Sequence, residues 1–286
     1  MVKKDFKTLL SGAGEAFHII SDTPRLDAEL LLAHLLKKDR SWLLIHANDL
    51  ADEALCLSYE RLIERRKKGE PVAYIVGERE FMGLPFSVAP GVLIPRPDTE
   101  TLVEAVLAEK LPESPQILDL CTGSGAIAVS LAHYLAKAQV LAVDISETCV
   151  KTAQENAERN SVANRVCVVC ADILKEDFSL PCLPVDVLVS NPPYIRTDDL
   201  SGLMADVRDY EPHPALDGGM DGLIFYRRLA SLVPQLLKQG GLLAVEVGHD
   251  QAEDVAAILE ESGECEKIRF ACDLAGIKRV VIANRK

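Results

Sequence analysis

The chain has 286 residues, of which 48% are hydrophobic and 26% are charged, and its formal net charge at pH 7 is −13. These values are ordinary for a soluble globular protein, and the length suits about two domains. The negative balance repels phosphate backbones and argues against extended nucleic-acid binding, although it allows a local basic patch. No apolar run approaches the ~18 residues that a membrane-spanning helix needs, so we expect no membrane association.

The eight cysteines point to a reducing compartment. The basic N-terminus has no long apolar region behind it, so we expect no signal peptide and a cytoplasmic location. Cys167 and Cys170 form a lone CxxC in a strand-like run, where a three-residue offset directs the two side chains to opposite faces. Structural zinc needs four convergent ligands, and no second CxxC or HxxxH is present. The sequence therefore predicts no metal site.

Residues 1–75 are predicted to form a small helical domain. A helix is expected to start at Ser21–Pro24, where a capping oxygen precedes a proline at the first helical position. A further helix is expected from Asp52 to Lys68, and four basic residues close it. Because cations complement a helix C-terminus, we interpret these residues as a helix end rather than as a nucleic-acid contact.

Residues 76–97 are predicted to form a β-hairpin linker. The segments Val72–Gly77 and Leu84–Val88 resemble strands on either side of Gly83, and prolines interrupt the sequence after them. A helix is then expected from Asp98 to Lys110, which places the second domain at residues 98–286.

The second domain alternates strands with helices. Strands are expected at residues 116–121, 139–144, 166–170, 185–190, 240–248, 265–272 and 277–283, and helices at residues 123–137, 147–160, 221–239 and 251–262. Such alternation is typical of a doubly wound, mostly parallel sheet. The predicted fold class is therefore α/β, a doubly wound Rossmann-like sheet preceded by a small helical domain.

The loop after the first of these strands is a candidate cofactor site. Gly123 and Gly125 allow the backbone to approach a ligand closely, and Asp144 ends the next strand about twenty residues on, where a carboxylate can accept both hydroxyls of a ribose. Together with Ala128 the glycines also fit the pattern of a dinucleotide-binding dehydrogenase. A hydride-transferring enzyme that prefers NAD thus remains a remote alternative.

Three details favour S-adenosylmethionine over NAD. Asp119, just before the loop, would repel a pyrophosphate but suits the ammonium of a methionyl group. The spacing Asp-x-x-x-Gly-x-Gly resembles the first motif of class I methyltransferases. The third strand ends at Asp172 and Ile173, which would place a carboxylate near the adenine edge and an apolar side chain against its face. Asp172 is alternatively a helix N-cap.

The tetrapeptide Asn191–Tyr194 follows a short apolar run that is typical of a buried strand, so it lies where open α/β sheets bind ligands. A planar amide or exocyclic amine is a poor nucleophile, because its lone pair is delocalised. The side-chain oxygen of Asn191 and the carbonyl of Pro192 can accept hydrogen bonds from such an NH₂ group and orient it, and Tyr194 can stack on it. This chemistry needs positioning and electrostatics rather than a strong base.

Asn-Pro-Pro-Tyr resembles the motif of amino-group methyltransferases that act on DNA adenine N6, on ribosomal guanine N2 or on protein glutamine N5. Further motifs cover nearly the whole chain: Arg25–His34, Gly69–Gly77, Glu80-Phe81, Leu93–Glu100, Tyr210–Gly219 and Asp221-Gly222. Together they resemble the HemK/PrmC family. The resemblance implies a class I methyltransferase fold and methylation of the glutamine in the Gly-Gly-Gln loop of class I peptide chain release factors. The methyl donor would be S-adenosylmethionine, and the product S-adenosylhomocysteine.

The resemblance also implies roles for individual residues. By the resemblance, the cofactor-binding residues would be Cys121, Thr122, Gly123, Ser124, Gly125, Asp144, Ile173 and Asn191. The reasoning above adds Asp119 and Asp172 to this set. The substrate-binding residues would be Asn191, Pro192, Pro193, Tyr194, Arg96 and Glu211, with Asn191, Pro192 and Tyr194 also catalytic. The family usually has glycine at the position of Cys121 and often an aromatic residue at that of Ile173. The latter departure would weaken stacking on adenine.

The helical domain would dock the release factor. We expect a monomer, because no motif demands a dimer, and no stable nucleic-acid complex. Two other functions remain open: an amino-group methyltransferase that acts on a nucleic-acid base, which an electropositive groove near the tetrapeptide would favour, and an accessory module that binds the cofactor without methyl transfer.

Overall fold

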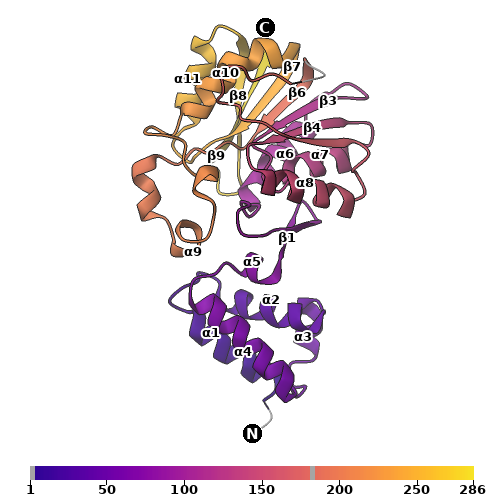
Figure 1. The fold of residues 1–286 in the computed structure, drawn as a ribbon, viewed down its shortest axis with the longest axis vertical. Coiled ribbons are helices and arrows are strands. Elements are labelled where there is room, and N and C mark those ends of the chain that lie inside the picture. Colours follow the sequence, from indigo (N-terminus) through magenta and orange to yellow (C-terminus); the bar gives the residue numbers. More distant parts are fainter. Residues whose placement is uncertain (1–3, 181–183) are drawn as a thin grey trace. The chain divides into compact units, whose positions relative to one another are not determined.

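The computed structural model describes residues 4–180 and 184–286 (Figure 1). The chain forms two compact units. The first, called here the N-terminal unit, comprises residues up to Glu78 together with Met204–Tyr210; the second, the sheet unit, comprises Arg79–Leu203 and Glu211–Lys286.

The described part of the N-terminal unit is helical. It contains α1 (Phe6–Phe17), α2 (Pro24–Leu36), α3 (Arg40–Ile45), α4 (Glu53–Lys67), α5 (Val72–Val76) and α9 (Ala205–Arg208). Aspartates start three of these helices: the side chains of Asp5, Asp39 and Asp52 accept hydrogen bonds from backbone N–H groups of the first turn. The proline-marked start of α2 is confirmed, with Pro24 as its first residue.

The basic end of α4 is used within this unit. Arg66 is only 4% exposed and forms an ion pair with Asp27, at 2.9 Å from Nε to Oδ2. Its guanidinium also donates to the carbonyl of Ile20, and Arg65 pairs with Glu70. These contacts agree with the interpretation of the cluster as a helix end.

One predicted strand is wrong. Residues 72–76 form the one-turn helix α5, because Pro71 starts the turn and Gly77 ends it in a left-handed conformation at φ +79°. The β-branched residues suggested a strand, but Ile75 packs into the helical core of the N-terminal unit. The hairpin itself is present and lies slightly later, as β1 (Glu78–Phe81) and β2 (Leu84–Ser87).

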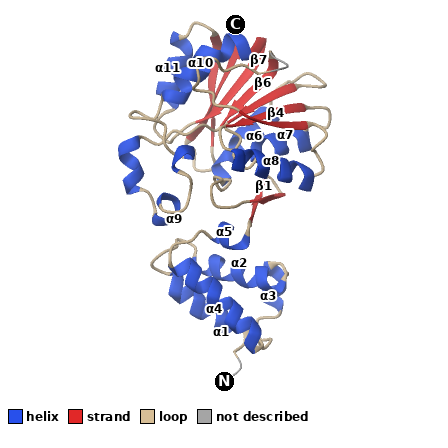
Figure 2. Ribbon diagram, viewed as in Figure 1, coloured by secondary structure: helices blue, strands red, loops and turns tan. Residues whose placement is uncertain are grey.

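The sheet unit is built on one seven-stranded sheet. Its strands are β3 (Gln116–Leu120), β4 (Gln139–Asp144), β5 (Val166–Cys170), β6 (Val185–Ser190), β7 (Leu237–Glu246), β8 (Cys265–Cys272) and β9 (Lys278–Arg285), in the order β5-β4-β3-β6-β7-β9-β8. The first five in this order are parallel, and β9 is antiparallel to both of its neighbours. The predicted mostly parallel sheet is confirmed (Figure 2).

Helices cover both faces of the sheet (Figure 1). One apolar core contains residues of α6 (Glu100–Leu107), α7 (Ala126–Tyr134) and α8 (Glu147–Arg159), and the other contains residues of α10 (Ile224–Leu236) and α11 (Ala252–Glu261). Successive strand residues enter opposite cores, as Val187 and Leu188 do. This burial on both faces explains why the strands appear in the sequence as continuous apolar runs.

The strand order reverses between β3 and β6. From β3 the chain proceeds outward to β4 and β5, and then returns to β6 on the other side of β3. Short 3₁₀ helices accompany this edge: η1 (Pro97–Thr99) before α6, and η2 (Thr197–Gly202) and η3 (His213–Ala215) after β6. A crevice at the carboxyl ends of strands beside such a reversal is the usual ligand site of open α/β sheets.

Candidate active site

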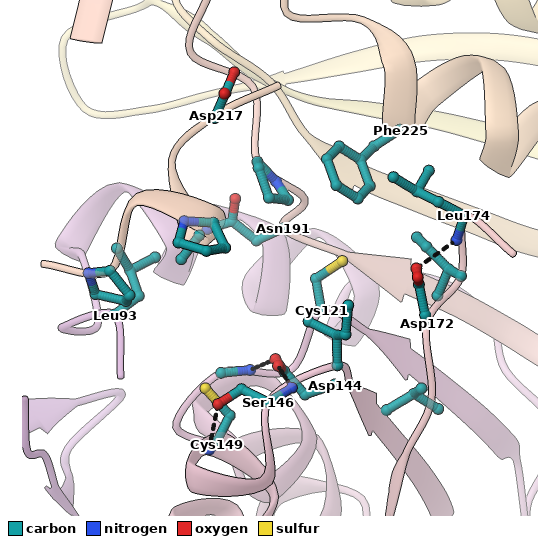
Figure 3. A pocket seen from close by; sticks show the side chains of 18 of the residues that line it. Leu93, Cys121, Asp144, Ser146, Cys149, Asp172, Leu174, Asn191, Asp217 and Phe225 are labelled. Carbon is teal, nitrogen blue, oxygen red and sulfur yellow. Dashed lines mark hydrogen bonds between the residues drawn. The ribbon is translucent and has the colours of Figure 1, made fainter. Parts of the chain in front are cut away.

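A cavity of about 490 Å³ lies at the carboxyl ends of β3, β4, β5 and β6 (Figure 3). Its volume is within the ~300–1,000 Å³ of small-molecule sites. The lining residues are Gly91, Leu93, Cys121, Gly123, Val143, Asp144, Ile145, Ser146, Cys149, Ala171, Asp172, Ile173, Leu174, Asn191, Pro193, Pro212, Pro214, Ala215, Asp217, Gly219, Ile224 and Phe225. Six of the residues predicted to bind the cofactor are therefore on its wall: Cys121, Gly123, Asp144, Asp172, Ile173 and Asn191. Pro193 of the tetrapeptide lines it as well.

The loop after β3 turns tightly through left-handed conformations. Gly123 and Gly125 have φ of +55° and +80°, and Cys121 has φ of +62°. A Cβ on Gly125 would lie 2.9 Å from the Cβ of Ala153, so glycine is needed for α8 to pack here. At Cys121 a glycine would adopt the same φ without strain, which gives a physical reason for the glycine expected there from the family resemblance.

Asp144 ties this loop to β4. Its Oδ2 accepts from the backbone N–H of Gly123 at 2.8 Å, and its Oδ1 accepts from that of Ser146 at 2.9 Å. Burial raises the pKa of the carboxyl, and these backbone hydrogen bonds oppose the rise. Because a carboxylate offers about four acceptor positions, Asp144 can still accept hydroxyl groups from a ligand in the cavity.

Asp119 lies behind the loop and is fully buried. Its Oδ2 accepts from the hydroxyl of Thr122 at 2.6 Å, whereas its Oδ1 makes no well-formed hydrogen bond with the described residues. Burial raises the pKa of Asp119 to about 7, against hydrogen bonds from Thr122 and Ala128 that lower it. Asp119, Thr122, Ser124 and Gly125 do not line the cavity.

The wall after β5 is mostly apolar. Asp172 Oδ1 accepts from the backbone N–H of Leu174 at 2.9 Å, which closes a local turn rather than capping a helix. Ile173 and Leu174 line the cavity there. Phe225, from the first turn of α10, also directs its ring into the cavity (Figure 3). Sequence reasoning missed Phe225, because no local motif marks it and only the fold brings α10 to this wall.

The tetrapeptide is held from several sides. Asn191 Nδ2 donates to the hydroxyl of Thr99, at 3.1 Å, so the amide of this side chain is anchored on the segment before α6. Gln251 Nε2 donates to the carbonyl of Tyr194 at 2.9 Å, and a Cβ on Gly222 would lie only 2.4 Å from that oxygen. The backbone after the prolines is therefore closely enclosed.

Two residues of the tetrapeptide do not line the cavity. Pro192 is buried, and the hydroxyl of Tyr194 points to the carboxylate of Glu246, with 3.4 Å between the oxygens. Burial raises the pKa of Tyr194 above its ordinary value, and the nearby Glu246 charge adds to the rise. The hydroxyl of Tyr194 is thus engaged by Glu246, and its side chain is not part of the cavity wall.

The predicted substrate residues Arg96 and Glu211 form an ion pair, with 2.5 Å between Nη2 and Oε1. Neither lines the cavity, and the Glu211 side chain is 1% exposed. Glu211 directly precedes Pro212, which is part of the wall, so the pair connects the segment before η1 to that wall.

Among the described residues, no group of three or more histidine, cysteine, aspartate or glutamate side chains is arranged to hold a metal ion. In residues 4–180 and 184–286, no helix is both long and apolar enough to cross a membrane.

Comparison with known proteins shows the family. Residues 7–77 match the model of the PrmC N-terminal domain, and residues 97–206 match that of the methyltransferase small domain. The release factor glutamine methyltransferase of Moorella thermoacetica is 45% identical over 286 residues, which cover 98% of this chain and 99% of that protein. The enzyme of the same name from Clostridium acetobutylicum is 45% identical over 260 residues, covering 91% of this chain and 90% of that protein.

A solved structure supports the fold. A methyltransferase from Pyrococcus furiosus superimposes with a TM-score of 0.51 at 19% identity, covering 79% of this chain and 96% of that one. The predicted methyltransferase fold is confirmed. From the two matching domain models and from relatives that are similar over their whole length, this chain belongs to the family of release factor glutamine methyltransferases.

Proposed function

We propose that this protein transfers a methyl group from S-adenosylmethionine to the side-chain amide nitrogen of the glutamine in the Gly-Gly-Gln loop of a class I peptide chain release factor. The assignment of the site rests mainly on the surroundings of the Asn191 side chain. Its Nδ2 is engaged by Thr99 while the residue lines a ligand-sized cavity, so its Oδ1 remains available to a substrate amide. The names of the relatives support the choice of substrate.

The residues present fit the cofactor. Asp144 has acceptor capacity for the ribose hydroxyls, and Asp172 is placed for the adenine edge beside the apolar side chains of Ile173 and Phe225. The buried Oδ1 of Asp119 makes no well-formed hydrogen bond with the part of the chain that the structure describes, and a nearby cationic ammonium would stabilise its charged form. When bound, the cofactor supplies an electrophilic methyl group on its sulfonium.

Phe225 modifies one expectation. The aromatic residue that the family often has at Ile173 is absent, but the Phe225 ring lines the same cavity. We assign Phe225 an apolar contact with the adenine ring of the cofactor, because an aromatic ring packs on adenine better than the aliphatic side chain of Ile173 does.

Catalysis here depends on orientation. Asn191 Oδ1 would accept a hydrogen bond from one N–H of the glutamine amide, and the carbonyl of Pro192, which is bonded to the cavity-lining Pro193, would accept from the other. Together the two acceptors would fix the plane of the amide nitrogen. The same two acceptors would stabilise the positive charge that develops on the nitrogen as the N–C bond forms and the S–C bond of the sulfonium breaks. S-adenosylhomocysteine would then leave, and the nitrogen would give up one of its two protons to water. In this scheme Pro193 forms part of the cavity wall. Tyr194 holds the backbone after the prolines in place through its hydrogen bond to Glu246, and it does not stack on the substrate.

The N-terminal unit is assigned to docking of the release factor. Its match to the PrmC N-terminal domain supports this role, as do large apolar side chains on its surface, among them Ile19, Leu44 and Ile45 at 94%, 67% and 79% exposure. The protein acts in the cytoplasm as a monomer and forms no stable complex with nucleic acid; its net charge of −13 supports the last point.

The test is methyl transfer from labelled S-adenosylmethionine to three acceptors: a purified class I release factor, its Gln→Ala variant in the Gly-Gly-Gln loop, and duplex DNA. We expect label on the wild-type factor alone. Label on the DNA would favour a nucleic-acid base as substrate, and label on both factor variants would place the modified residue elsewhere. Binding of the cofactor without any transfer would indicate an accessory module.

A further inference from the structure

One part of the cavity wall is not used by the cofactor contacts or by the mechanism above. It is formed by the segment that leads from η3 to α10, and its lining residues are Pro212, Pro214, Ala215, Asp217, Gly219 and Ile224. Of these six residues, only Asp217 has a polar side chain. Figure 3 shows Asp217 on the far side of Asn191 from Asp144. A single polar group in an otherwise apolar wall is typical of a site that orients a ligand.

Backbone pairing fixes Asp217 against the tetrapeptide. The N–H of Ile195 donates to the carbonyl of Leu216 at 2.9 Å, and the N–H of Gly218 donates to the carbonyl of Ile195 at 2.8 Å. Asp217 and Ile195 thereby form an isolated parallel bridge. A Cβ on Gly218 would lie 2.7 Å from the Cα of Tyr194, so the two segments are in close contact. The position of Asp217 relative to the tetrapeptide is therefore well defined.

One oxygen of the Asp217 carboxylate holds the local fold, and the other does not. Oδ1 accepts from the hydroxyl of Thr197 at 2.8 Å and from the backbone N–H of Gly219 at 2.9 Å. Within the described part of the chain, Oδ2 accepts no hydrogen bond. A carboxylate offers about four acceptor positions, so Oδ2 can accept two hydrogen bonds from a ligand.

The backbone of this segment offers few other acceptors. Five of its carbonyls already accept hydrogen bonds from backbone N–H groups: those of Pro212, His213, Leu216, Gly218 and Gly219. A peptide that enters this part of the cavity brings main-chain N–H donors, and a buried N–H group without an acceptor is costly. Oδ2 of Asp217 is the acceptor that this wall provides for them.

The glutamine of the proposed substrate brings its own main chain to this wall. Its side-chain amide would be held at Asn191, and only two methylene groups separate the amide carbon from the Cα. The main chain of the Gly-Gly-Gln loop would therefore lie within one side-chain length of Asn191. Two successive N–H groups converge on one anion where the backbone turns through a left-handed conformation. Glycine adopts that conformation without strain.

We propose that Asp217 is a substrate-binding residue whose Oδ2 accepts hydrogen bonds from successive main-chain N–H groups of the Gly-Gly-Gln loop. This contact selects glycine beside the glutamine, because a residue with a side chain resists the left-handed conformation that brings the two N–H groups together. The inference rests on the proposed function and adds to it a reason for specificity toward the residues that flank the methylated one.

The variant Asp217→Asn isolates the contact. Asparagine retains an oxygen for Thr197 and Gly219 but puts an NH₂ group in place of Oδ2, and two donors cannot hydrogen-bond to each other. With S-adenosylhomocysteine at saturation, we expect the Kd for a fluorescently labelled release factor, measured by anisotropy, to rise about tenfold or more. The KM for methylation should rise in parallel, while the cofactor Kd stays within about threefold.

Asp198→Asn is the matched control, because it removes the same charge from an exposed residue of the neighbouring η2. Its Kd and KM for the factor should equal those of the wild type. An equal rise in both variants would show a general effect of charge and would overturn the proposal, as would an Asp217→Asn variant with wild-type Kd and KM.

A release factor in which alanine replaces the glycine next to the glutamine tests the selection of glycine. We expect this change to raise the Kd for the wild-type protein about tenfold, and the Kd for Asp217→Asn by no more than about threefold, since the acceptor that requires the left-handed conformation is gone. Equal costs in the two proteins would overturn the inference.

The binding measurement is independent of turnover. Wild-type protein that binds the factor in this Asp217-dependent way but transfers no methyl group would refute only the proposed function. Methylation of the glutamine with the same Kd and KM in wild type and Asp217→Asn would refute only the inference. Absence of any binding between the wild-type protein and the factor would refute both.

Discussion

Removal of the Asn191 side chain by Asn191→Ala tests the core of the proposed chemistry. The change deletes the acceptor oxygen that would hold the glutamine amide and also frees the Thr99 hydroxyl from its 3.1 Å contact. It leaves the walls formed by Asp144 and Phe225 in place.

The expected magnitude follows from the type of interaction lost. Removing one preorganised hydrogen-bonding group at a reacting centre typically costs about 10²–10³ in kcat, or ~2.7–4 kcal/mol. An ordinary hydrogen bond to the cofactor is worth less, ~0.5–1.5 kcal/mol net, which is about tenfold at most. We therefore expect kcat to fall by at least about a hundredfold, while the cofactor Kd changes by no more than about tenfold.

The assay combines single-turnover methylation of a release factor with calorimetric titration of the cofactor. Asn164→Ala, which alters an exposed asparagine in the loop before β5, is the matched control and should retain both values. Turnover by Asn191→Ala at the wild-type rate would refute the role of Asn191. Equal losses of kcat and of cofactor affinity would show that the side chain acts mainly in cofactor binding.

Three further changes test other parts of the account. Asp144→Ala should weaken cofactor binding by about tenfold or more with little effect on the KM for the release factor; undiminished affinity in a calorimetric titration would exclude the ribose role. The pKa of Asp119 is about 7 in the folded protein against an ordinary 3.8. As pH rises, Asp119 therefore ionises first in the unfolded chain. The free energy of unfolding then decreases between about pH 4 and pH 7, by up to ~4 kcal/mol. Asp119→Asn should therefore raise the melting temperature of cofactor-free protein more at pH 8 than at pH 4, and an equal rise at both would contradict the burial argument. Gly222→Ala forces a Cβ to within 2.4 Å of the Tyr194 carbonyl and should cost roughly 2 kcal/mol or more, measured by denaturant unfolding. Gly276→Ala has a similar φ of +79° but no atom within 4 Å, so it reports backbone strain alone; an equal cost in both variants would argue against the clash.

Local patterns were sufficient to predict much of the sheet unit. The strands at 139–144, 166–170 and 185–190 were placed at their observed bounds, because each is a short, mostly apolar run of the length and composition typical of a strand. The loop after β3 was also recognisable, since its glycines are required by backbone conformation at fixed positions. A structure can be predicted from sequence where its backbone conformation, such as the positive φ of these glycines, restricts the position to one residue type.

Contacts between distant segments were not predictable in the same way. The Thr99 contact of Asn191 spans 92 residues, and the Tyr194 contact with Glu246 spans 52. Neither leaves a pattern in the local sequence. Tyr194 was expected to stack on the substrate because an aromatic residue beside Asn-Pro-Pro suits that role, but its ring direction is set by packing against the core that contains α10 and β7.

The helix α5 shows a different limit. Its β-branched residues favour a strand by propensity, yet burial of Ile75 and the flanking Pro71 and Gly77 determine a single helical turn. Tertiary packing overrides propensity most readily in short segments, where only a few residues contribute to the preference.

The most direct test of the central claim is tandem mass spectrometry of a class I release factor after incubation with the protein and S-adenosylmethionine. The account predicts one added methyl group, located on the side-chain nitrogen of the glutamine in the Gly-Gly-Gln loop, and none after incubation with Asn191→Ala. A methyl group on any other residue, or an unmodified glutamine under conditions in which the cofactor binds, would contradict it.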